Sequence, residues 1–213
     1  MKVGILGSGD VGIQLANGFL ALNHKVKIGT RDTSKQNITN WLEQNSNAST
    51  GSFEETAAFG DLIIIATLWA ATPDVINLSN KNNFTGKTVI DVTNPLDFSK
   101  GMPPTLSIGH TDSAGETVQR LLPQAKVVKA FNTVGNAHFY HPNFPGGPPT
   151  MFICGNDSES KKQVTSILKD FGWETLDTGG IEASRLLEPL AMIWILHYFK
   201  TNTGNHAFKL LRK

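Results

Sequence analysis

The sequence predicts an α/β protein of the Rossmann type, in which a doubly wound, mostly parallel sheet carries a small C-terminal helical and αβ extension. Three observations predict this class. A glycine-rich turn follows the first hydrophobic segment. Segments of strand length alternate with segments of helix length along the chain. Hydrophobic residues make up 39% of the 213 residues and charged residues 17%, which supports a sizeable folded core.

The first 30 residues predict a strand, a turn, a helix and a second strand. Val3 to Leu6 is a short hydrophobic run, as is typical of a buried parallel strand. A helix that ends near Asn23 is then indicated by hydrophobic residues at helical spacing: Ile13, Leu15, Ala16, Phe19 and Leu20. The second strand begins at Val26. This succession has the length of a βαβ unit.

The same alternation continues to the end of the chain. We expect helices over residues 34–45, 54–59, 74–78, 113–122, 158–171 and 182–200. We expect strands over residues 62–66, 88–92, 126–130, 151–154 and 174–176. The least regular stretches, 95–109 and 132–149, are rich in Pro, Gly, Asn and His and predict long loops that are either functional or mobile. Residues 1–150 are expected to form the Rossmann domain and residues 151–213 the extension packed on it, or both to form one continuous domain.

Composition excludes several classes of protein. The chain has 19 Lys and Arg residues and 18 Asp and Glu residues, which gives a net charge of +1. This balance argues against nucleic acid and anionic membranes as partners. The single cysteine, Cys154, allows neither an internal disulfide nor a cysteine-rich metal site, and we expect it to be inert packing. No signal peptide precedes the first strand, and the longest hydrophobic run, 190–196, is too short to span a bilayer. We therefore expect a cytoplasmic protein without a metal.

The glycine turn, Gly7-Ser8-Gly9-Asp10-Val11-Gly12, predicts a dinucleotide site. Such a pattern is weak alone, but here it directly follows a strand and opens a helix. Gly7 allows the tight turn, Gly9 lets the backbone approach a pyrophosphate, and Gly12 lets the helix pack closely on the strand. The helix N-terminus offers free N–H groups and partial positive charge. We expect the Asp10 carboxylate to point away from the anion or to cap the helix.

The end of the second strand favours NADP over NAD. Thr30, Arg31 and Lys35 can together hold a 2′-phosphate, and the planar guanidinium donates two hydrogen bonds to phosphate oxygens. The alternative is that Asp32 accepts from the ribose 2′-OH of NAD and that Arg31 is a solvated surface charge. Asp32 lies past the expected strand end, where it is well placed to cap the following helix.

Three more strand ends should flank the ribose and nicotinamide, because ligands bind outside the carboxyl ends of such strands. The first is Thr67-Leu68-Trp69, where the indole either forms a wall of the pocket or packs on the domain. The others contain Asn94 and Asn132-Thr133. Asn94 and Asn132 either bond to the ribose or carboxamide or hold their turns.

No general acid, base or nucleophile stands out, and we predict no catalytic side chain. The chain lacks HExxH and GxSxG motifs, and His197 is expected to be a core histidine of the final helix. Hydride transfer between nicotinamide and a flavin-like ring needs face-to-face positioning more than a side-chain acid. The pattern therefore indicates an oxidoreductase with a flavin-like acceptor.

The sequence resembles the F420-dependent NADP oxidoreductase family from Met1 to about Asn202. The resemblance is carried by the glycine turn and by segments beginning at Gly29, Trp69, Lys129, Ile153 and Leu176, the last followed by Ser184-Arg185-Leu186-Leu187-Glu188. It implies a Rossmann domain with a small C-terminal part. It also implies that the glycine turn holds the pyrophosphate, that Thr30, Arg31 and Lys35 hold the 2′-phosphate, and that nicotinamide meets the deazaflavin near Asn132 and Thr133.

One departure concerns the acceptor. Deazaflavin-using members carry a His-Thr pair where this chain has Asn132-Thr133. The pair Phe131-Asn132 is more similar to the corresponding residues in the cytosolic domain of six-transmembrane ferric reductases, which pass electrons from NADPH to flavin. The resemblance thus implies NADP as cofactor and leaves F420, FMN and FAD open as co-substrates.

We therefore interpret the chain as an NADP(H)-binding oxidoreductase that exchanges a hydride with a flavin or deazaflavin. One alternative is a redox sensor that binds NADP without turnover. The other is a small imine or carbonyl reductase, although such enzymes need a longer helical domain after the nucleotide fold. The final helix is hydrophobic nearly all round, so we expect a homodimer through it.

Overall fold

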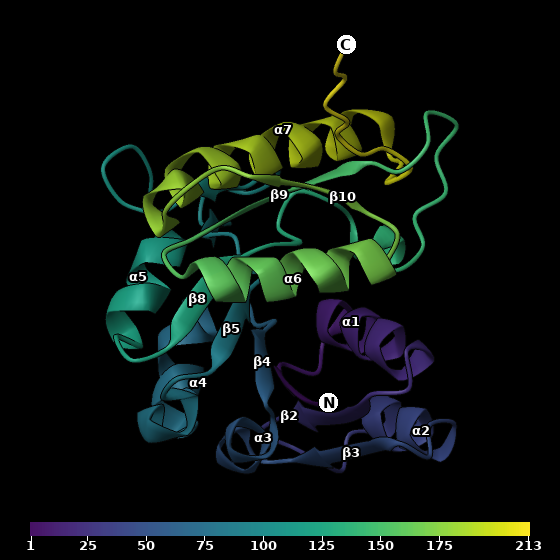
Figure 1. Ribbon diagram of the computed structural model, residues 1–213, viewed down its shortest axis with the longest axis vertical. Coiled ribbons are helices and arrows are strands. Elements are labelled where there is room, and N and C mark those ends of the chain that lie inside the picture. Colours follow the sequence, from purple (N-terminus) through teal and green to yellow (C-terminus); the bar gives the residue numbers. More distant parts are fainter.

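The computed structural model describes residues 1–213 as one eight-stranded sheet with helices on both faces (Figure 1). Its strands are β1 (Lys2–Leu6), β2 (Lys25–Gly29), β3 (Ala48–Gly51), β4 (Leu62–Ile65), β5 (Thr88–Asp91), β8 (Lys126–Lys129), β9 (Thr150–Gly155) and β10 (Glu174–Asp177). The helices are α1 (Asp10–Ala21), α2 (Gln36–Glu43), α3 (Phe53–Phe59), α4 (Thr72–Leu78), α5 (Ala114–Leu121), α6 (Ser158–Asp170) and α7 (Ser184–Thr201). A separate two-stranded pair is formed by β6 (Leu96–Asp97) and β7 (Thr105–Leu106).

The strand order places the ligand crevice between β1 and β4. The order is β10-β9-β8-β5-β4-β1-β2-β3, and the six strands from β8 to β3 are mutually parallel. The strands β1, β2 and β3 lie side by side in sequence order, and the next strand, β4, pairs with the opposite side of β1. Leu6 at the end of β1 pairs with Ile65 at the end of β4. Such a reversal leaves a crevice outside the carboxyl ends of the two strands.

The strand β9 runs antiparallel to β8, with Cys154 opposite Lys129, and β10 is parallel to β9. Because β8 and β9 are antiparallel, the connection over residues 130–149 starts and finishes at the same end of the strands. This is the carboxyl end of the parallel strands, where the crevice lies. The connection contains only one short 3-10 helix, Asn136–His138.

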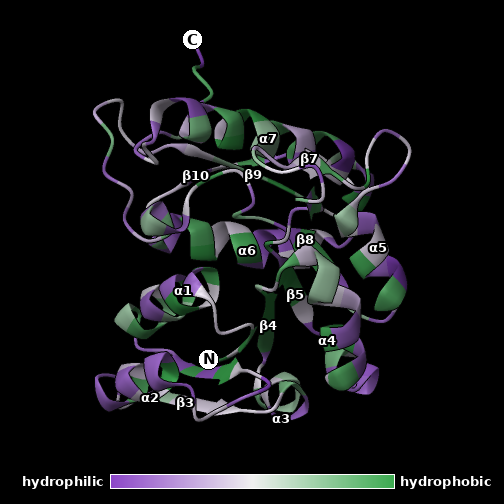
Figure 2. Ribbon diagram, turned by 180° about the vertical axis from the view of Figure 1, so that it is seen from behind, coloured by the Kyte–Doolittle hydropathy of each residue, from purple (hydrophilic) through white to green (hydrophobic).

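Two hydrophobic clusters cover the two faces of the sheet. One joins the inner strands to α1, α2 and α6 through Leu15, Phe19, Ile38, Ile167 and Phe171. The other joins them to α3, α4, α5 and α7 through Phe53, Val75, Val118 and Leu187. Between the faces, β4 is hydrophobic along its whole length (Figure 2). The structure confirms the doubly wound α/β fold.

The helices begin where the sequence supplies caps. The Ser52 hydroxyl accepts from the Glu55 amide, and the Glu55 carboxylate accepts from the Ser52 amide in return, which caps α3 on both sides. Ser113 caps α5 by accepting from the Glu116 amide, and Asp157 caps α6. No helix in the structure combines the length and the hydrophobicity of a membrane span.

Some elements differ from the predictions. The sequence analysis missed β3, an edge strand of small and polar residues, because Ala48–Gly51 lacks a hydrophobic run. It also missed β6 and β7 inside the irregular stretch 95–109. The prediction that His197 is a core histidine was wrong, because His197 is exposed on α7. Its ring makes an edge contact with the His206 ring of the C-terminal tail, at a centroid distance of 4.6 Å.

Candidate cofactor-binding site

The glycine turn is shaped by close backbone contacts. Gly7 has φ +130°, and a Cβ there would lie 2.3 Å from the Ala66 carbonyl oxygen. A Cβ on Gly12 would lie 2.1 Å from the Gly7 carbonyl oxygen. Both contacts are with backbone atoms, so the glycines are required for β1, β4 and α1 to meet closely.

The space outside Gly9 is open. A Cβ on Gly9 would meet no atom within 4 Å, so the missing side chain leaves a free approach to the start of α1. Gly9 is also the N-cap and supplies no side-chain cap, while the first helical hydrogen bond runs from the Ile13 amide to the Gly9 carbonyl. The amides of Asp10 and Val11 in the first turn therefore remain available for an anion. The Asp10 side chain is exposed. The turn fits a pyrophosphate.

Thr30 links the glycine turn to the loop after β2. Its hydroxyl accepts from the Ser8 hydroxyl at 3.1 Å and donates to the Asp32 carbonyl at 3.2 Å, and Thr30 is only 5% exposed. Arg31 and Lys35 flank this point with exposed side chains. The link holds the glycine turn and the loop after β2 in one arrangement, with the two unpaired cations of Arg31 and Lys35 beside them.

Asp32 is engaged within its own turn. Its Oδ1 accepts from the Ser34 amide at 2.9 Å and from the Ser34 hydroxyl at 2.6 Å. These bonds from the Ser34 side chain and backbone lower the pKa of Asp32. The expected capping of the next helix does not occur, because Lys35 is the N-cap of α2 and Asp32 closes the turn before it. The charged side chains of this loop that have no partner are therefore those of Arg31 and Lys35.

A cavity of about 280 Å³ lies beside Arg31. Its other lining residues come from the start and the length of α4: Ala71, Asp74, Val75, Asn77 and Leu78. Three of its six lining residues are hydrophobic, and the Arg31 guanidinium lies on one side, where a flat aromatic base can stack on it. The sequence analysis did not identify these α4 residues, although the Pro73 that opens the helix marks where the wall begins.

The segment after β4 has mixed roles. The Thr67 and Thr72 hydroxyls are hydrogen-bonded at 2.8 Å, which fixes the turn into α4. Leu68 is 78% exposed beside the end of β4. Trp69, in the 3-10 helix Trp69–Ala71, is partly buried and packs against the cluster under α3, α4, α5 and α7. Trp69 therefore packs on its own domain, and its second role, as a wall of the pocket, remains a prediction.

Asn94 and Asn132 hold each other across the ends of β5 and β8. The Asn94 Nδ2 donates to the Asn132 carbonyl at 2.8 Å, and the Asn132 Nδ2 donates to the Asn94 Oδ1 at 3.1 Å. The Asn132 Nδ2 also donates to the Leu187 carbonyl of α7 at 3.0 Å. Asn132 and Thr133 are 5% and 2% exposed. The two strand ends and the first turn of α7 therefore form one unit.

Phe131, immediately before this pair, has a strained backbone. Its φ is +62°, a conformation that a bulky side chain rarely adopts. The ring is held by edge and tilted contacts with Phe139 and Phe171, at centroid distances of 5.3 and 5.8 Å. This packing on the α1 and α6 face offsets the strain. It turns the chain so that the next side chain, Asn132, faces α7.

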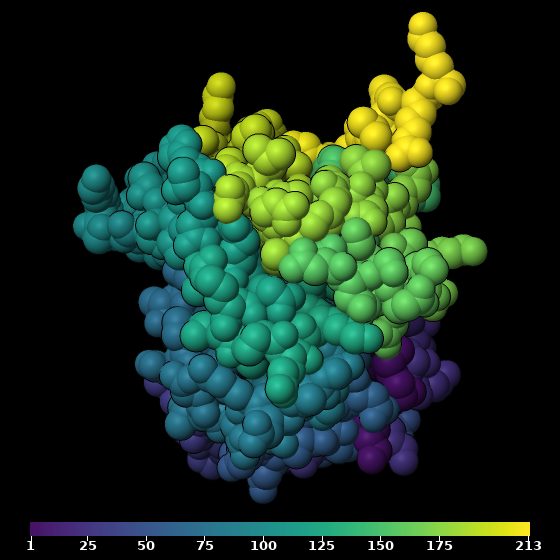
Figure 3. Space-filling view, turned by 60° about the vertical axis from the view of Figure 1, so that its left-hand side comes forward, coloured from purple at the N-terminus to yellow at the C-terminus, as the bar shows by residue number.

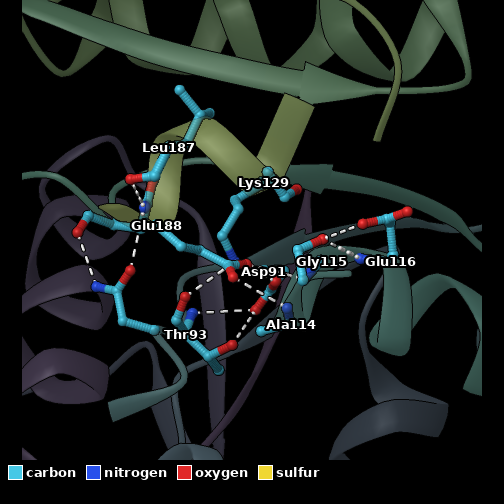
Figure 4. Close-up of polar contacts among 12 residues, drawn as sticks. Asp91, Thr93, Ala114, Gly115, Glu116, Lys129, Leu187 and Glu188 are labelled. Carbon is cyan, nitrogen blue, oxygen red and sulfur yellow. Dashed lines mark hydrogen bonds and ion pairs between the residues drawn. The ribbon is translucent and has the colours of Figure 1, made fainter. Parts of the chain in front are cut away.

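A fully buried ion cluster lies behind the strand ends (Figure 4). The Lys129 Nζ contacts the Asp91 Oδ2 at 2.7 Å, the Glu188 Oε1 at 3.0 Å and the Thr93 carbonyl at 2.9 Å. All three charged side chains are at most 1% exposed. The Glu188 carboxylate also accepts from the backbone amides that begin α5, at Ala114 and Gly115, each at 3.0 Å.

The charges of this cluster balance through the helix terminus. Two carboxylates face one ammonium, and the partial positive charge at the start of α5 offsets part of the remaining negative charge. Burial acts to lower the pKa of Lys129, but the Asp91 and Glu188 carboxylates outweigh it and raise that pKa. Burial raises the pKa of Glu188, against the opposing effect of Lys129. The sequence analysis gave these residues no individual role, because only the fold brings residues 91, 129 and 188 together.

Cys154 lies behind this cluster and is buried. Burial raises the pKa of its thiol to about 11, although the bond with the Ser184 hydroxyl at 3.2 Å opposes the rise. The thiol is therefore protonated at neutral pH. The structure confirms that Cys154 packs in the interior, and its lack of reactivity remains a prediction.

Comparison with known proteins shows which family this chain resembles over nearly its whole length. Residues 2–95 match the family model described as NADP oxidoreductase, coenzyme F420-dependent. The F420-dependent NADP reductase of Methanocaldococcus jannaschii is 32% identical over 96% of both chains. The metalloreductase STEAP3 of Rattus norvegicus is 28% identical over 90% of this chain but only 36% of its own length.

Solved structures agree. A provisionally assigned F420-dependent NADP-reductase of Arthrobacter sp. FB24 has a TM-score of 0.95 and 37% identity over the whole of both chains. The imine reductase of Streptomyces aurantiacus has a TM-score of 0.66 and 16% identity, and the match covers 94% of this chain and 65% of that enzyme. At such low identity the second comparison concerns the fold alone.

Proposed function

This chain belongs to the family of coenzyme F420-dependent NADP oxidoreductases, and from that premise we propose that it exchanges a hydride between NADP(H) and an F420-type deazaflavin. NADP, when bound, supplies the nicotinamide carbon that gives or accepts the hydride. The residues of the chain bind and orient the two rings and exclude water. The observation that carries the proposal is the open glycine turn at Gly9, next to a loop whose free charges are Arg31 and Lys35.

The proposed site assigns a part of NADP to each strand end. The amides around Ser8, Asp10 and Val11 bind the pyrophosphate, with Gly7 and Gly9 forming the turn. Thr30, Arg31 and Lys35 bind the 2′-phosphate. The residues after β4, which are Thr67, Leu68 and Trp69, and those after β5 and β8, which are Asn94, Asn132 and Thr133, border the ribose and nicotinamide.

The test of the adenosine end is Arg31→Ala. We expect it to weaken NADPH binding far more than NADH binding, by about 1–3 kcal/mol, because only NADPH loses a charged contact. Isothermal titration with both cofactors measures the difference. The matched control is Arg120→Ala, which removes an arginine paired with Asp112 on the surface of α5. Equal losses for NADPH and NADH would refute the 2′-phosphate assignment.

The test of the acceptor is a spectrophotometric screen of NADPH oxidation with F420, FMN and FAD. Turnover with F420 is expected. A flavin as acceptor is the second candidate, because the chain is also similar to the metalloreductase STEAP3. A redox sensor would bind NADPH and turn over none of the three acceptors, so the screen separates catalysis from sensing.

The homodimer expected from the sequence also remains a proposal. It is supported by hydrophobic side chains on α7 that no part of this chain covers, with Leu186, Ile193 and Leu196 being 73%, 59% and 48% exposed. The helix lies on the surface at one end of the molecule, beside the projecting C-terminal tail (Figure 3). Light scattering at micromolar concentration should give a dimer, and Ile193→Glu should give a monomer. A monomeric wild type would refute the dimer.

A further inference from the structure

The last residues of the chain fold back beside α7 (Figure 1). Asn202 ends the helix with φ +51°, and its amide donates to the Tyr198 carbonyl at 2.7 Å. A residue in this left-handed conformation commonly ends a helix and redirects the chain. Residues 203–210, which we call the strap, then pass from the end of α7 to the start of β9.

His206 and Trp194 fasten the strap to α7 with two hydrogen bonds and a ring stack. The Trp194 Nε1 donates to the His206 carbonyl at 2.8 Å, and the His206 Nε2 donates to the Trp194 carbonyl at 3.1 Å. The two rings are stacked at a centroid distance of 4.4 Å and an angle of 21°. Because a carbonyl only accepts, the His206 Nε2 carries the ring hydrogen. The His206 Nδ1 is buried without a partner, so the hold on this ring comes from Nε2 and the stack.

Trp194 passes this restraint to the connection over residues 130–149. A Cβ on Gly135 would lie 2.9 Å from the Trp194 ring, so the indole packs directly on the backbone of Gly135. Gly135 lies two residues after Thr133. Val134 and Ala207 of the strap pack against the same hydrophobic cluster. The first part of the connection is therefore held by a side chain that the strap itself holds.

The strap also holds the other end of the connection. The Thr150 amide donates to the Phe208 carbonyl at 2.9 Å, and the Thr150 hydroxyl accepts from the Leu210 amide at 3.1 Å. The Lys209 Nζ donates to the Pro148 carbonyl at 2.7 Å. Pro148 and Thr150 lie where the connection enters β9. One segment thus restrains both ends of the connection.

We propose that the strap, fastened at His206 and Trp194, fixes the shape of the connection and thereby the fit of the hydride acceptor. The inference rests on the proposed function, in which the two rings meet beside the strand ends from which this connection starts. His206 and Trp194 are positioning residues, because they act through Gly135. No hydrogen bond or ion pair joins the strap to the glycine turn or to the loop after β2, so cofactor binding there should not depend on the strap.

The test is His206→Ala in the full chain, which removes the ring stack and the bond from Nε2. Hydrogen exchange followed by mass spectrometry should become about 5- to 150-fold faster over residues 132–150, the effect of one lost hydrogen bond and one lost aromatic stack. Exchange over residues 7–12 should not change. The affinity for NADPH, measured by isothermal titration, should equal that of the wild type, whereas kcat/KM for F420 should fall.

The matched control is Trp41→Phe, which removes an indole hydrogen bond of 2.7 Å to Asn17 and should leave exchange over residues 132–150 unchanged. Unchanged exchange there in His206→Ala would refute the strap. Faster exchange with an unchanged kcat/KM for F420 would refute its effect on the acceptor. A wild type that binds NADPH without reducing F420 would refute the proposed function and this effect with it, while exchange still decides the strap. If His206→Ala does not fold, Trp194→Phe, which removes the Nε1 donor, replaces it with the same expectations.

Discussion

Replacing Lys129 with methionine tests whether the buried ion cluster stabilises the fold. The ammonium has three hydrogens and three acceptors, at 2.7 Å on Asp91, 2.9 Å on Thr93 and 3.0 Å on Glu188. Methionine fills a similar volume but leaves two carboxylates without their counter-ion. Removing one partner of a buried pair costs about 3–5 kcal/mol. At about 2–4 °C per kcal/mol for a chain of this size, the melting temperature should fall by roughly 10 °C.

The matched control is Lys126→Met on the same strand. Lys126 lies 3.6 Å from Asp157, and the two side chains are 43% and 32% exposed, so the pair is worth about 0–1 kcal/mol. Urea and thermal unfolding followed by circular dichroism measure both variants. If Lys129→Met is as stable as Lys126→Met, the cluster does not hold β5, β8 and α7 together as described. A loss restored by adding Glu188→Gln would trace the cost to the uncompensated carboxylate.

Three further outcomes follow. The native Cys154 should react slowly with a thiol reagent at pH 8 and become reactive in urea, because burial raises its pKa to about 11; equal rates with and without urea would contradict this. The Arg185 hydrogen bonds lower the pKa of Glu116, so the free energy of unfolding should fall as the pH drops through and below 4.5, and Arg185→Ala should flatten this dependence in acid titrations. In Gly12→Ala a methyl group meets the Gly7 carbonyl oxygen at 2.1 Å, and calorimetry should show weaker NADPH binding and a lower melting temperature than for Gly146→Ala, a control at a glycine with open space around it.

The parts of the site that depend on neighbouring residues could be predicted from the sequence. The turn from Gly7 to Gly12 is a local conformation, and its position between a strand and a helix determines where the pyrophosphate fits. The loop with Thr30 and Arg31 follows from the same βαβ unit. Most strands were found for a similar reason, because buried parallel strands such as Leu62–Ile65 are continuous hydrophobic runs.

The parts that depend on distant residues could not be predicted. Asp91, Lys129 and Glu188 are far apart in sequence, and each is an ordinary charged residue until the fold removes it from water. The reversed direction of β9 is also invisible, because a hydrophobic run does not reveal which way it pairs. The bond from Asn132 to the Leu187 carbonyl requires α7 to return over the sheet, and no local pattern encodes that return.

The reversal at β9 has a consequence for how such proteins diversify. A further parallel strand would need a crossover that carries the chain to the opposite end of the strands, whereas here residues 130–149 stay at the end that carries the proposed cofactor site. Insertions or exchanges in this connection would reshape the rim facing the second substrate and leave the dinucleotide half untouched. The same fold can in this way become specific for a new electron acceptor through changes in one connecting segment.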